Sequence, residues 1–205
     1  MSFLHDVYFC ISRLWHKRLI AEIGTKTELR FGSVLYHGEK VHIGKKCQIG
    51  KGFVCAVYTE YGGEDTPIKI CSDGGVFISD KVTANRNLTI YCANKIEIGA
   101  GTMMGSFILL TDNNHGTNAG LEPNYREQAL TTKRVSIGKN CWIAEKCSIL
   151  AGTIIGDRCI IAANSVVTGG TYPDKCILAG NPARIIRIWN DEAGEWMKNS
   201  NEGMV

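Results

Sequence analysis

Aliphatic residues recur at every sixth position through the C-terminal half of the chain. From residue 137 the blocks I-G-K-N-C-W, I-A-E-K-C-S, I-L-A-G-T-I, I-G-D-R-C-I, I-A-A-N-S-V and V-T-G-G-T-Y each begin with Ile or Val. A helix places apolar residues every three or four positions, and a half-buried strand places them every second position. A strict period of six predicts instead a solenoid of short β-strands joined by turns.

The fifth position of each block is always small, which predicts a side chain turned into the core. Four cysteines hold this position: Cys47, Cys141, Cys147 and Cys159. A free cysteine packs there as a small hydrophobic residue, and we interpret these thiols as structural groups, not metal ligands or redox centres. Three cysteines lie off the pattern and receive no role: Cys55, Cys71 and Cys92.

Shorter runs with the same spacing start at Ile43, Ile78 and Ile98, with changes of phase between them. We therefore expect regular coils over residues 41–188. They are interrupted by 53–68, a loop containing a Gly-Gly pair, and by 116–134, which is polar and has no strand pattern. Loops as long as the second one are usually functional when they are ordered.

The two ends of the chain are expected to differ from the coils. Residues 1–40 are predicted to form an N-terminal helix and cap, because apolar residues follow a helical spacing over 1–20. Peripheral membrane attachment is the alternative role, although one short helix with few cations binds weakly. Residues 189–205 are predicted to be a tail, with either a short helix or a frayed end over 189–200.

Composition narrows the class of protein. The 205 residues suit one domain with a short appendage, and a net charge of +3 is too small for a nucleic-acid binder. No apolar run reaches the length of a membrane span, and the start does not resemble a secretory signal. Nine cysteines without such a signal favour reduced thiols and a cytoplasmic location. No phosphate-binding glycine motif stands between a predicted strand and helix.

The repeat resembles that of the hexapeptide-repeat acyltransferases, and the similarity covers about three quarters of the chain. The resemblance implies an all-β solenoid, a left-handed parallel β-helix of triangular section with three hexads in each coil. The left hand is implied by the resemblance alone, since periodicity does not determine handedness. The resemblance also implies a homotrimer with three sites at the subunit interfaces.

His115 lies in the phrase T-D-N-N-H-G at the mouth of the 116–134 insertion. An imidazole exchanges protons near neutral pH, so it can take a proton from a hydroxyl and return it to a leaving thiol. The phrase is similar to the site of the galactoside and maltose acetyltransferases and of polysaccharide O-acetyltransferases. There the base is a histidine just before the protruding loop, which implies this role for His115. A solvent-exposed histidine without a role is the alternative, and we favour it for the other four histidines.

A base of this kind needs a partner on its other ring nitrogen. Asp112 is the nearest carboxylate in sequence and is the first candidate, with Glu122 second. Asp112 has an alternative role as a brace for the turn, with a backbone carbonyl orienting the imidazole. Residues 84–90 read A-N-R-N-L-T-I and resemble a stretch of the galactoside acetyltransferases. The resemblance implies that Asn85 faces the acceptor hydroxyl, unless it only stacks along a turn, whereas Asn87 suits the turn itself.

The C-terminal coils resemble the coenzyme A site of the same family, with W-I-A, I-A-A-N-S-V-V-T and G-N-P-A-R-I-I-R as the matching phrases. The resemblance assigns acetyl-CoA binding to Trp142, Ala144, Ala163, Thr168, Arg184 and Arg187. Small residues let the pantetheine arm approach the backbone, and the guanidinium groups would meet phosphates. Alternatives remain for three of them: Trp142 as packing between subunits, and Arg184 and Arg187 as a solvated pair. Ala144 and Ala162 stand where the family commonly has glycine.

The leading hypothesis is an acetyl-CoA-dependent O-acetyltransferase acting on a carbohydrate hydroxyl, in a surface polysaccharide or its precursor. Acetyl-CoA would be a cosubstrate, with no tightly bound cofactor and no metal. The alternatives are an N-acetyltransferase of an amino sugar, a xenobiotic acetyltransferase, and a non-catalytic β-helix scaffold. A zinc enzyme on the same fold would need several histidine ligands, and none of the other histidines shares the repeat phase near His115.

Overall fold

The structure is a computed structural model, and it describes residues 19–30, 32–61, 68–69, 74–120 and 124–199. It contains short β-strands and one 3-10 turn, η1 (Gly38–Lys40). The helix predicted over 1–20 lies almost wholly outside the described residues, as do Cys71 and Glu122. No helix in the described ranges is long and apolar enough to cross a membrane.

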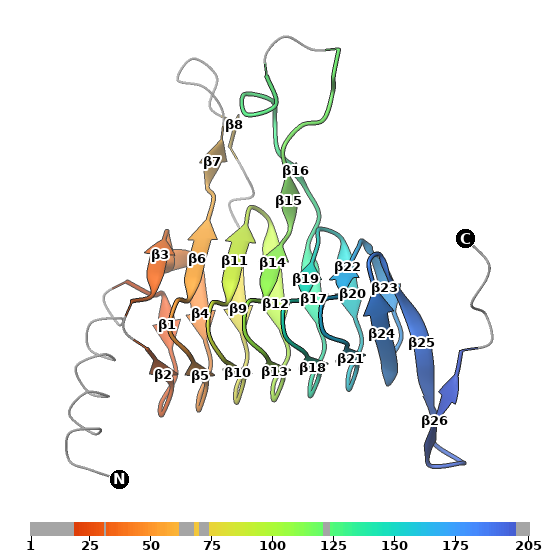
Figure 1. Cartoon of the computed structure of the whole chain (residues 1–205). Coiled ribbons are helices and arrows are strands. Elements are labelled where there is room, and N and C mark those ends of the chain that lie inside the picture. The colour runs from red at the N-terminus through yellow and green to blue at the C-terminus, as the bar shows by residue number, and fades with distance from the viewer. Residues whose placement is uncertain (1–18, 31, 62–67, 70–73, 121–123, 200–205) are drawn as a thin grey trace.

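Most of the strands form three sheets whose coils pair in parallel, and these sheets are the three faces of a left-handed parallel β-helix (Figure 1). The seven-stranded sheet contains β1 (Glu22–Ile23), β4 (Val41–Ile43), β9 (Gly75–Ile78), β12 (Lys95–Ile98), β17 (Val135–Ile137), β20 (Thr153–Ile155) and β23 (Gly170–Tyr172). The six-stranded sheet contains β3 (Val34–Tyr36), β6 (Val54–Val57), β11 (Thr89–Cys92), β14 (Leu109–Thr111), β19 (Ser148–Ile149) and β22 (Val166–Val167).

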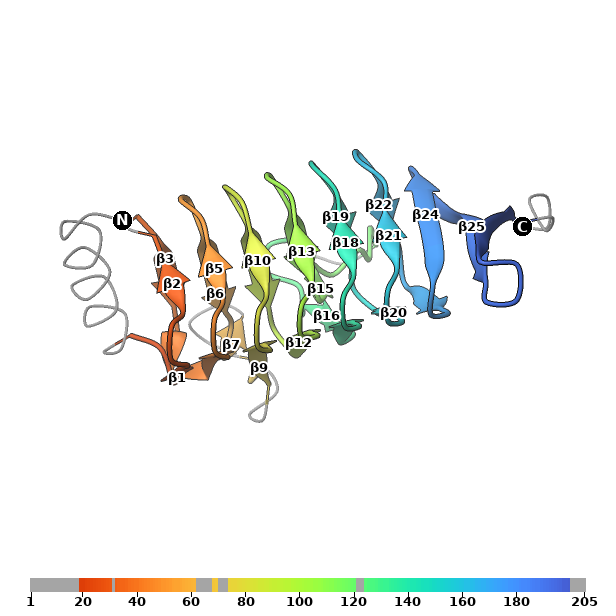
Figure 2. The same ribbon diagram turned by 90° about the horizontal axis from the view of Figure 1, so that it is seen from below.

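The nine-stranded sheet extends past the coils at its C-terminal end. It contains β2 (Glu28–Leu29), β5 (Gln48–Ile49), β10 (Thr83–Ala84), β13 (Met103–Met104), β18 (Trp142–Ile143), β21 (Ile160–Ile161), β24 (Cys176–Gly180), β25 (Ala183–Asn190) and β26 (Glu195–Lys198). Each coil passes from the seven-stranded to the nine-stranded and then to the six-stranded sheet, and the coils stack side by side along one axis (Figure 2).

Two small antiparallel hairpins leave the prism from the same side (Figure 1). The first pairs β7 (Glu60–Tyr61) with β8 (Ile68–Lys69), and the second pairs β15 (Asn113–Asn114) with β16 (Thr131–Thr132). Both interrupt a coil after its strand in the six-stranded sheet. The first interruption therefore begins later than the expected residue 53, because 54–57 is the regular strand β6.

The interior of the prism is filled by the side chains that open each hexad and by those at its fifth position. The inward row of the six-stranded sheet is Leu35, Cys55, Ile90, Leu110, Ile149 and Val167. The four cysteines predicted to point inward are all at most 2% exposed, which confirms their interpretation as small core residues. Burial raises the pKa of the Cys55 thiol to about 12, so this group is also an uncharged core side chain.

The β-helix begins before the expected residue 41. Strands β1, β2 and β3 form a complete first coil, in register with β4, β5 and β6. Ile23, Leu29 and Leu35 are six residues apart and carry the same repeat, but polar residues around them weaken the pattern.

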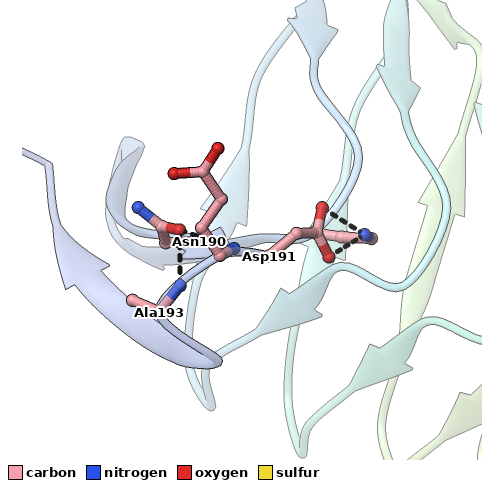
Figure 3. A network of polar contacts seen from close by, with 5 residues as sticks. Asn190, Asp191 and Ala193 are labelled. Atoms are coloured by element: carbon pink, nitrogen blue, oxygen red, sulfur yellow. Dashed lines mark hydrogen bonds and ion pairs between the residues drawn. The ribbon is translucent and has the colours of Figure 1, made fainter.

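The C-terminal end also differs from the expected helix or frayed tail. Residues 183–198 form an antiparallel hairpin in which Trp189 and Trp196 are paired in register, with ring centroids 5.4 Å apart. The Asn190 side chain accepts hydrogen bonds from two amides of the turn, including that of Ala193, each at 2.9 Å (Figure 3). The Asp191 carboxylate in this turn forms an ion pair with Lys175 of the last coil. The helix prediction is wrong because this turn chemistry lets the chain reverse and add strands to the sheet edge.

Candidate active site

The predicted site residues lie along two edges of the prism. The groove corner is the edge where the nine-stranded sheet passes into the six-stranded sheet, and the histidine corner is the edge where the six-stranded sheet passes into the seven-stranded sheet. Asn85 follows β10 and lies at the groove corner, whereas His115 follows β14 and β15 at the histidine corner. One face of the prism separates the two edges.

The groove corner is built from the residue that follows each strand of the nine-stranded sheet. The amide of each donates to a carbonyl of the next coil, and the row is Arg30, Gly50, Asn85, Gly105, Ala144 and Ala162. Space for side chains in this row is limited. A Cβ atom at Gly50 would lie 2.0 Å from the Asn85 carbonyl oxygen, and one at Gly105 would lie 2.9 Å from the Glu145 amide nitrogen. Gly50 and Gly105 therefore let the backbones of neighbouring coils approach closely at this edge.

A groove of about 1110 Å³ runs along this edge. Asn85, the exposed Phe107 and Asn164 are among its lining residues. The charged lining residues are four cations and two carboxylates, Arg30, Lys51, Arg86, Lys146, Glu28 and Glu145. The Glu145 carboxylate accepts the Ser106 amide at 2.8 Å. The groove therefore carries an excess of positive charge near Asn85.

Three of the six residues predicted to bind acetyl-CoA continue the groove corner toward the C-terminal end, and two lie on the adjoining nine-stranded sheet. Ala144 lies in the row itself, and Ala163 is exposed one residue beyond it. Arg184 is paired in register with Ala179, which continues the row. Trp142, 47% exposed, points outward from the nine-stranded sheet. Arg187 occupies the same outward row, through the register of β18, β21, β24 and β25.

Thr168 lies apart from these residues. It follows β22 at the histidine corner, next to Leu150 of the preceding coil. The structure therefore places the predicted donor residues at the groove corner, on the adjoining nine-stranded sheet and, for Thr168, at the same edge as His115.

The described part of the insertion after His115 is held by several hydrogen bonds. The Gln128 side chain is buried and bonds both backbone groups of Asn118, accepting from the amide at 3.1 Å and donating to the carbonyl at 3.0 Å. Gly116 lies so close to this side chain that a Cβ atom there would be 2.5 Å from the Gln128 Cβ. The base of the loop is closed by the Lys133 amide, which donates to the Asp112 carbonyl at 2.8 Å. These hydrogen bonds hold the segment that follows His115.

His115 is exposed, and its Nδ1 lies 2.9 Å from the hydroxyl oxygen of Tyr61. The same hydroxyl donates to the backbone carbonyl of Arg126 at 2.6 Å. The two rings are tilted by 60°, with centroids 5.4 Å apart. Tyr61 comes from β7 in the first insertion, and the sequence analysis missed it. The only available signal was an aromatic residue next to the Gly-Gly pair of a loop.

Asp112 is not brought to His115. Its fully buried carboxylate accepts the amides of Ala93 at 2.7 Å and Asn94 at 2.8 Å, in the preceding coil. The Cys92 thiol also donates to it at 3.3 Å. Burial, together with the negative charge of Asp112, raises the pKa of this thiol. The structure thus lacks the expected hydrogen bond from the His115 ring to Asp112 and favours the alternative role of Asp112 as a brace, because its carboxylate oxygens already accept backbone amides.

Across the ranges that the structure describes, no group of three or more His, Cys, Asp or Glu side chains could hold a metal ion. His37 lies beside Glu39, and His42 stacks on Phe77 with ring centroids 4.8 Å apart. His37 follows β3 in the first coil of the histidine corner, and His42 lies in β4 on the seven-stranded sheet.

Comparison with known proteins agrees with this architecture. A family model described as bacterial transferase hexapeptide (six repeats) matches residues 134–169. WbbJ of Escherichia coli (strain K12), named as a lipopolysaccharide biosynthesis O-acetyl transferase, is 35% identical over 133 residues, 61% of this chain and 66% of WbbJ. Galactoside O-acetyltransferase of the same strain is 30% identical over 127 residues, 62% of this chain and 61% of that enzyme.

Among solved structures, a variant of the N-acyltransferase AntD from Bacillus cereus, in complex with dTDP-4-amino-4,6-dideoxyglucose and coenzyme A, has a TM-score of 0.71. The match covers 88% of this chain and 90% of AntD, at 16% identity, and so shows the shared fold. The chain thus carries hexapeptide repeats of the bacterial transferase type and is similar in sequence to O-acetyltransferases. It spans less than two thirds of the length of each of the two E. coli relatives.

Proposed function

We propose that this protein is an acetyl-CoA-dependent O-acetyltransferase that acetylates a hydroxyl group of a carbohydrate. The observation that carries the proposal is the state of His115: it is exposed beside an ordered loop, and its Nδ1 is already engaged. In the described part of the chain its Nε2 has no hydrogen-bond partner. A neutral imidazole held in this way can act as a general base through Nε2.

In the reaction, Nε2 of His115 takes the proton from the acceptor hydroxyl as its oxygen attacks the thioester carbonyl of acetyl-CoA. The carbon–sulfur bond then breaks, and the imidazolium returns the proton to the leaving thiolate. The products are an acetyl ester and coenzyme A. Asn85 contributes an amide that both donates and accepts, which suits a sugar hydroxyl. Most of the catalysis comes from holding the two substrates together at the base.

We infer that each active site uses two chains. His115 and Asn85 lie on different edges of the same prism, separated by the six-stranded sheet. A second copy that presents its groove corner to the histidine corner of the first would bring them together, and a closed ring of three copies gives three equal sites. Thr168 would then face the donor strip of Ala144, Ala163 and Arg184 from the neighbouring chain.

Acetyl-CoA would occupy the C-terminal end of the groove, and the carbohydrate acceptor would occupy the other end. Arg184 and Arg187 at the C-terminal end suit the phosphates of coenzyme A. The part of the groove around Asn85 is left for the acceptor. The cations Lys51 and Arg86 there favour a carbohydrate with a negative charge, such as an activated precursor of a surface polysaccharide. Both E. coli relatives carry O-acetyl transfer in their names. The free, buried cysteines favour a reducing compartment, the cytoplasm.

The experiment is thiol release from acetyl-CoA by purified protein, with neutral sugars, sugar phosphates, amino sugars and oligosaccharides as acceptors. We expect acceptor-dependent release, and we expect His115→Ala to lower it about 10²- to 10⁴-fold. His42→Ala changes a histidine of β4, on the seven-stranded sheet and away from both corners, and serves as the control. Turnover of His115→Ala within a few-fold of wild type would remove His115 as the base. Preference for an amine over a hydroxyl would replace O-acetylation by N-acetylation.

A further inference from the structure

We propose that Tyr61 is the positioning residue that fixes the protonation state of His115, by accepting a hydrogen bond from its Nδ1–H. The proposal rests on the proposed function of His115 as a base. It concerns the contact between two insertions that both lie outside the repeat.

Counting protons at the Tyr61 hydroxyl assigns the direction of each hydrogen bond. A phenolic hydroxyl has one hydrogen to donate, and a backbone carbonyl only accepts. The 2.6 Å bond to the Arg126 carbonyl therefore uses the hydroxyl hydrogen of Tyr61. The 2.9 Å contact with His115 Nδ1 then needs its hydrogen from the imidazole. His115 carries its proton on Nδ1, and the lone pair of Nε2 is free.

This assignment matters because a histidine side chain in water favours the other tautomer, with the proton on Nε2. That form cannot take a proton through Nε2. A hydrogen-bond acceptor at Nδ1 reverses the preference, since the bond made by one ring nitrogen sets the state of the other. Asp112 cannot supply this acceptor, because its carboxylate is occupied by the amides of Ala93 and Asn94.

The contact also joins the two insertions mechanically. Tyr61 belongs to the β7–β8 hairpin, while Arg126 belongs to the loop that follows His115, and the hydroxyl links both to the imidazole. Both hairpins leave the prism on the same side (Figure 1). The orientation of the ring is thus set by two segments that are far apart in the sequence.

The direct test is nitrogen-15 NMR of the wild-type protein with labelled histidine, at a pH where imidazole is neutral. Five histidines are present, and the His115→Ala variant identifies the signals of His115. We expect a protonated Nδ1 and an unprotonated Nε2. A protonated Nε2 in the folded wild-type protein would overturn the proposal. This measurement needs no turnover, so it can fail or succeed independently of the proposed reaction.

The second test is Tyr61→Phe, which removes only the hydroxyl. We expect the His115 signals to shift toward the tautomer with the proton on Nε2, and kcat to fall about tenfold. The KM for acetyl-CoA should stay within about twofold, because no donor contact is lost. Tyr125→Phe, in the loop that follows His115 and 55% exposed, is the matched control and should keep the wild-type spectrum. An unchanged His115 tautomer in Tyr61→Phe would contradict the assignment.

Discussion

The groove corner and the histidine corner are two edges of the same prism, built from the same repeat, yet they differ in one respect. At the groove corner the coils turn in similar short bends, and small residues such as Gly50 and Ala144 keep the backbone close to the surface. At the histidine corner two coils are interrupted by insertions, which carry Tyr61 and His115. The regular edge forms a long groove, and the interrupted edge carries His115, the proposed general base.

The difference has a physical origin. Stacked parallel coils use the amides and carbonyls of each turn to bond the next coil, which leaves little freedom at a regular edge. An insertion must satisfy its own backbone, and here β7–β8 and β15–β16 do so as antiparallel hairpins. Free of the register of the coils, such a segment can direct side chains away from the prism, which is where functional loops occur.

The largest effect on stability is expected from Asp112→Ala at the histidine corner. The substitution leaves the amides of Ala93 and Asn94 without their charged acceptor. We expect the free energy of unfolding to fall by about 3 kcal/mol or more, measured by urea denaturation. Asp191→Ala removes an exposed carboxylate that pairs with Lys175 and should leave stability close to wild type.

A different outcome for Asp112 would change the account of this corner. If Asp112→Ala kept the wild-type stability but lost activity as severely as His115→Ala, Asp112 would be a partner of His115 and not a brace. Asp112 and the proposed base His115 would then act together, and Asp112 would not be a purely structural group.

A smaller effect is expected from Ala144→Leu at the groove corner. The larger side chain fills space where the pantetheine arm is proposed to lie, and we expect the KM for acetyl-CoA to rise about tenfold. Steady-state kinetics with varied acetyl-CoA would measure it. Ala100→Leu, at the edge between the seven-stranded and nine-stranded sheets, is the control. Equal KM values for both variants would mean that the donor does not follow the groove corner.

The sequence alone predicted which residues lie together at the groove corner better than it predicted those at the histidine corner. Ile143 and Ile161 are period-six positions and are paired in register in neighbouring coils. The repeat therefore also predicts that the next residues, Ala144 and Ala162, lie side by side at the groove corner. Tyr61 and His115 are 54 positions apart, and no periodicity connects two insertions. Asp112 was near His115 in sequence only. At the end of a strand, a separation of three residues does not place two side chains together.

The most direct test of the account is whether the two corners of different chains complete one active site. Two variants are needed, His115→Ala to inactivate the histidine corner and Ala144→Trp to block the groove corner, and each alone should be nearly inactive. Co-expression in equal amounts and purification of the mixed oligomers gives sites that combine an intact His115 with an intact groove. We expect about a third of the wild-type activity, because one of the three interfaces in each mixed ring of three combines an intact His115 with an intact groove. Activity no higher than that of the two parent variants, in oligomers verified to be mixed, would contradict a site shared between chains.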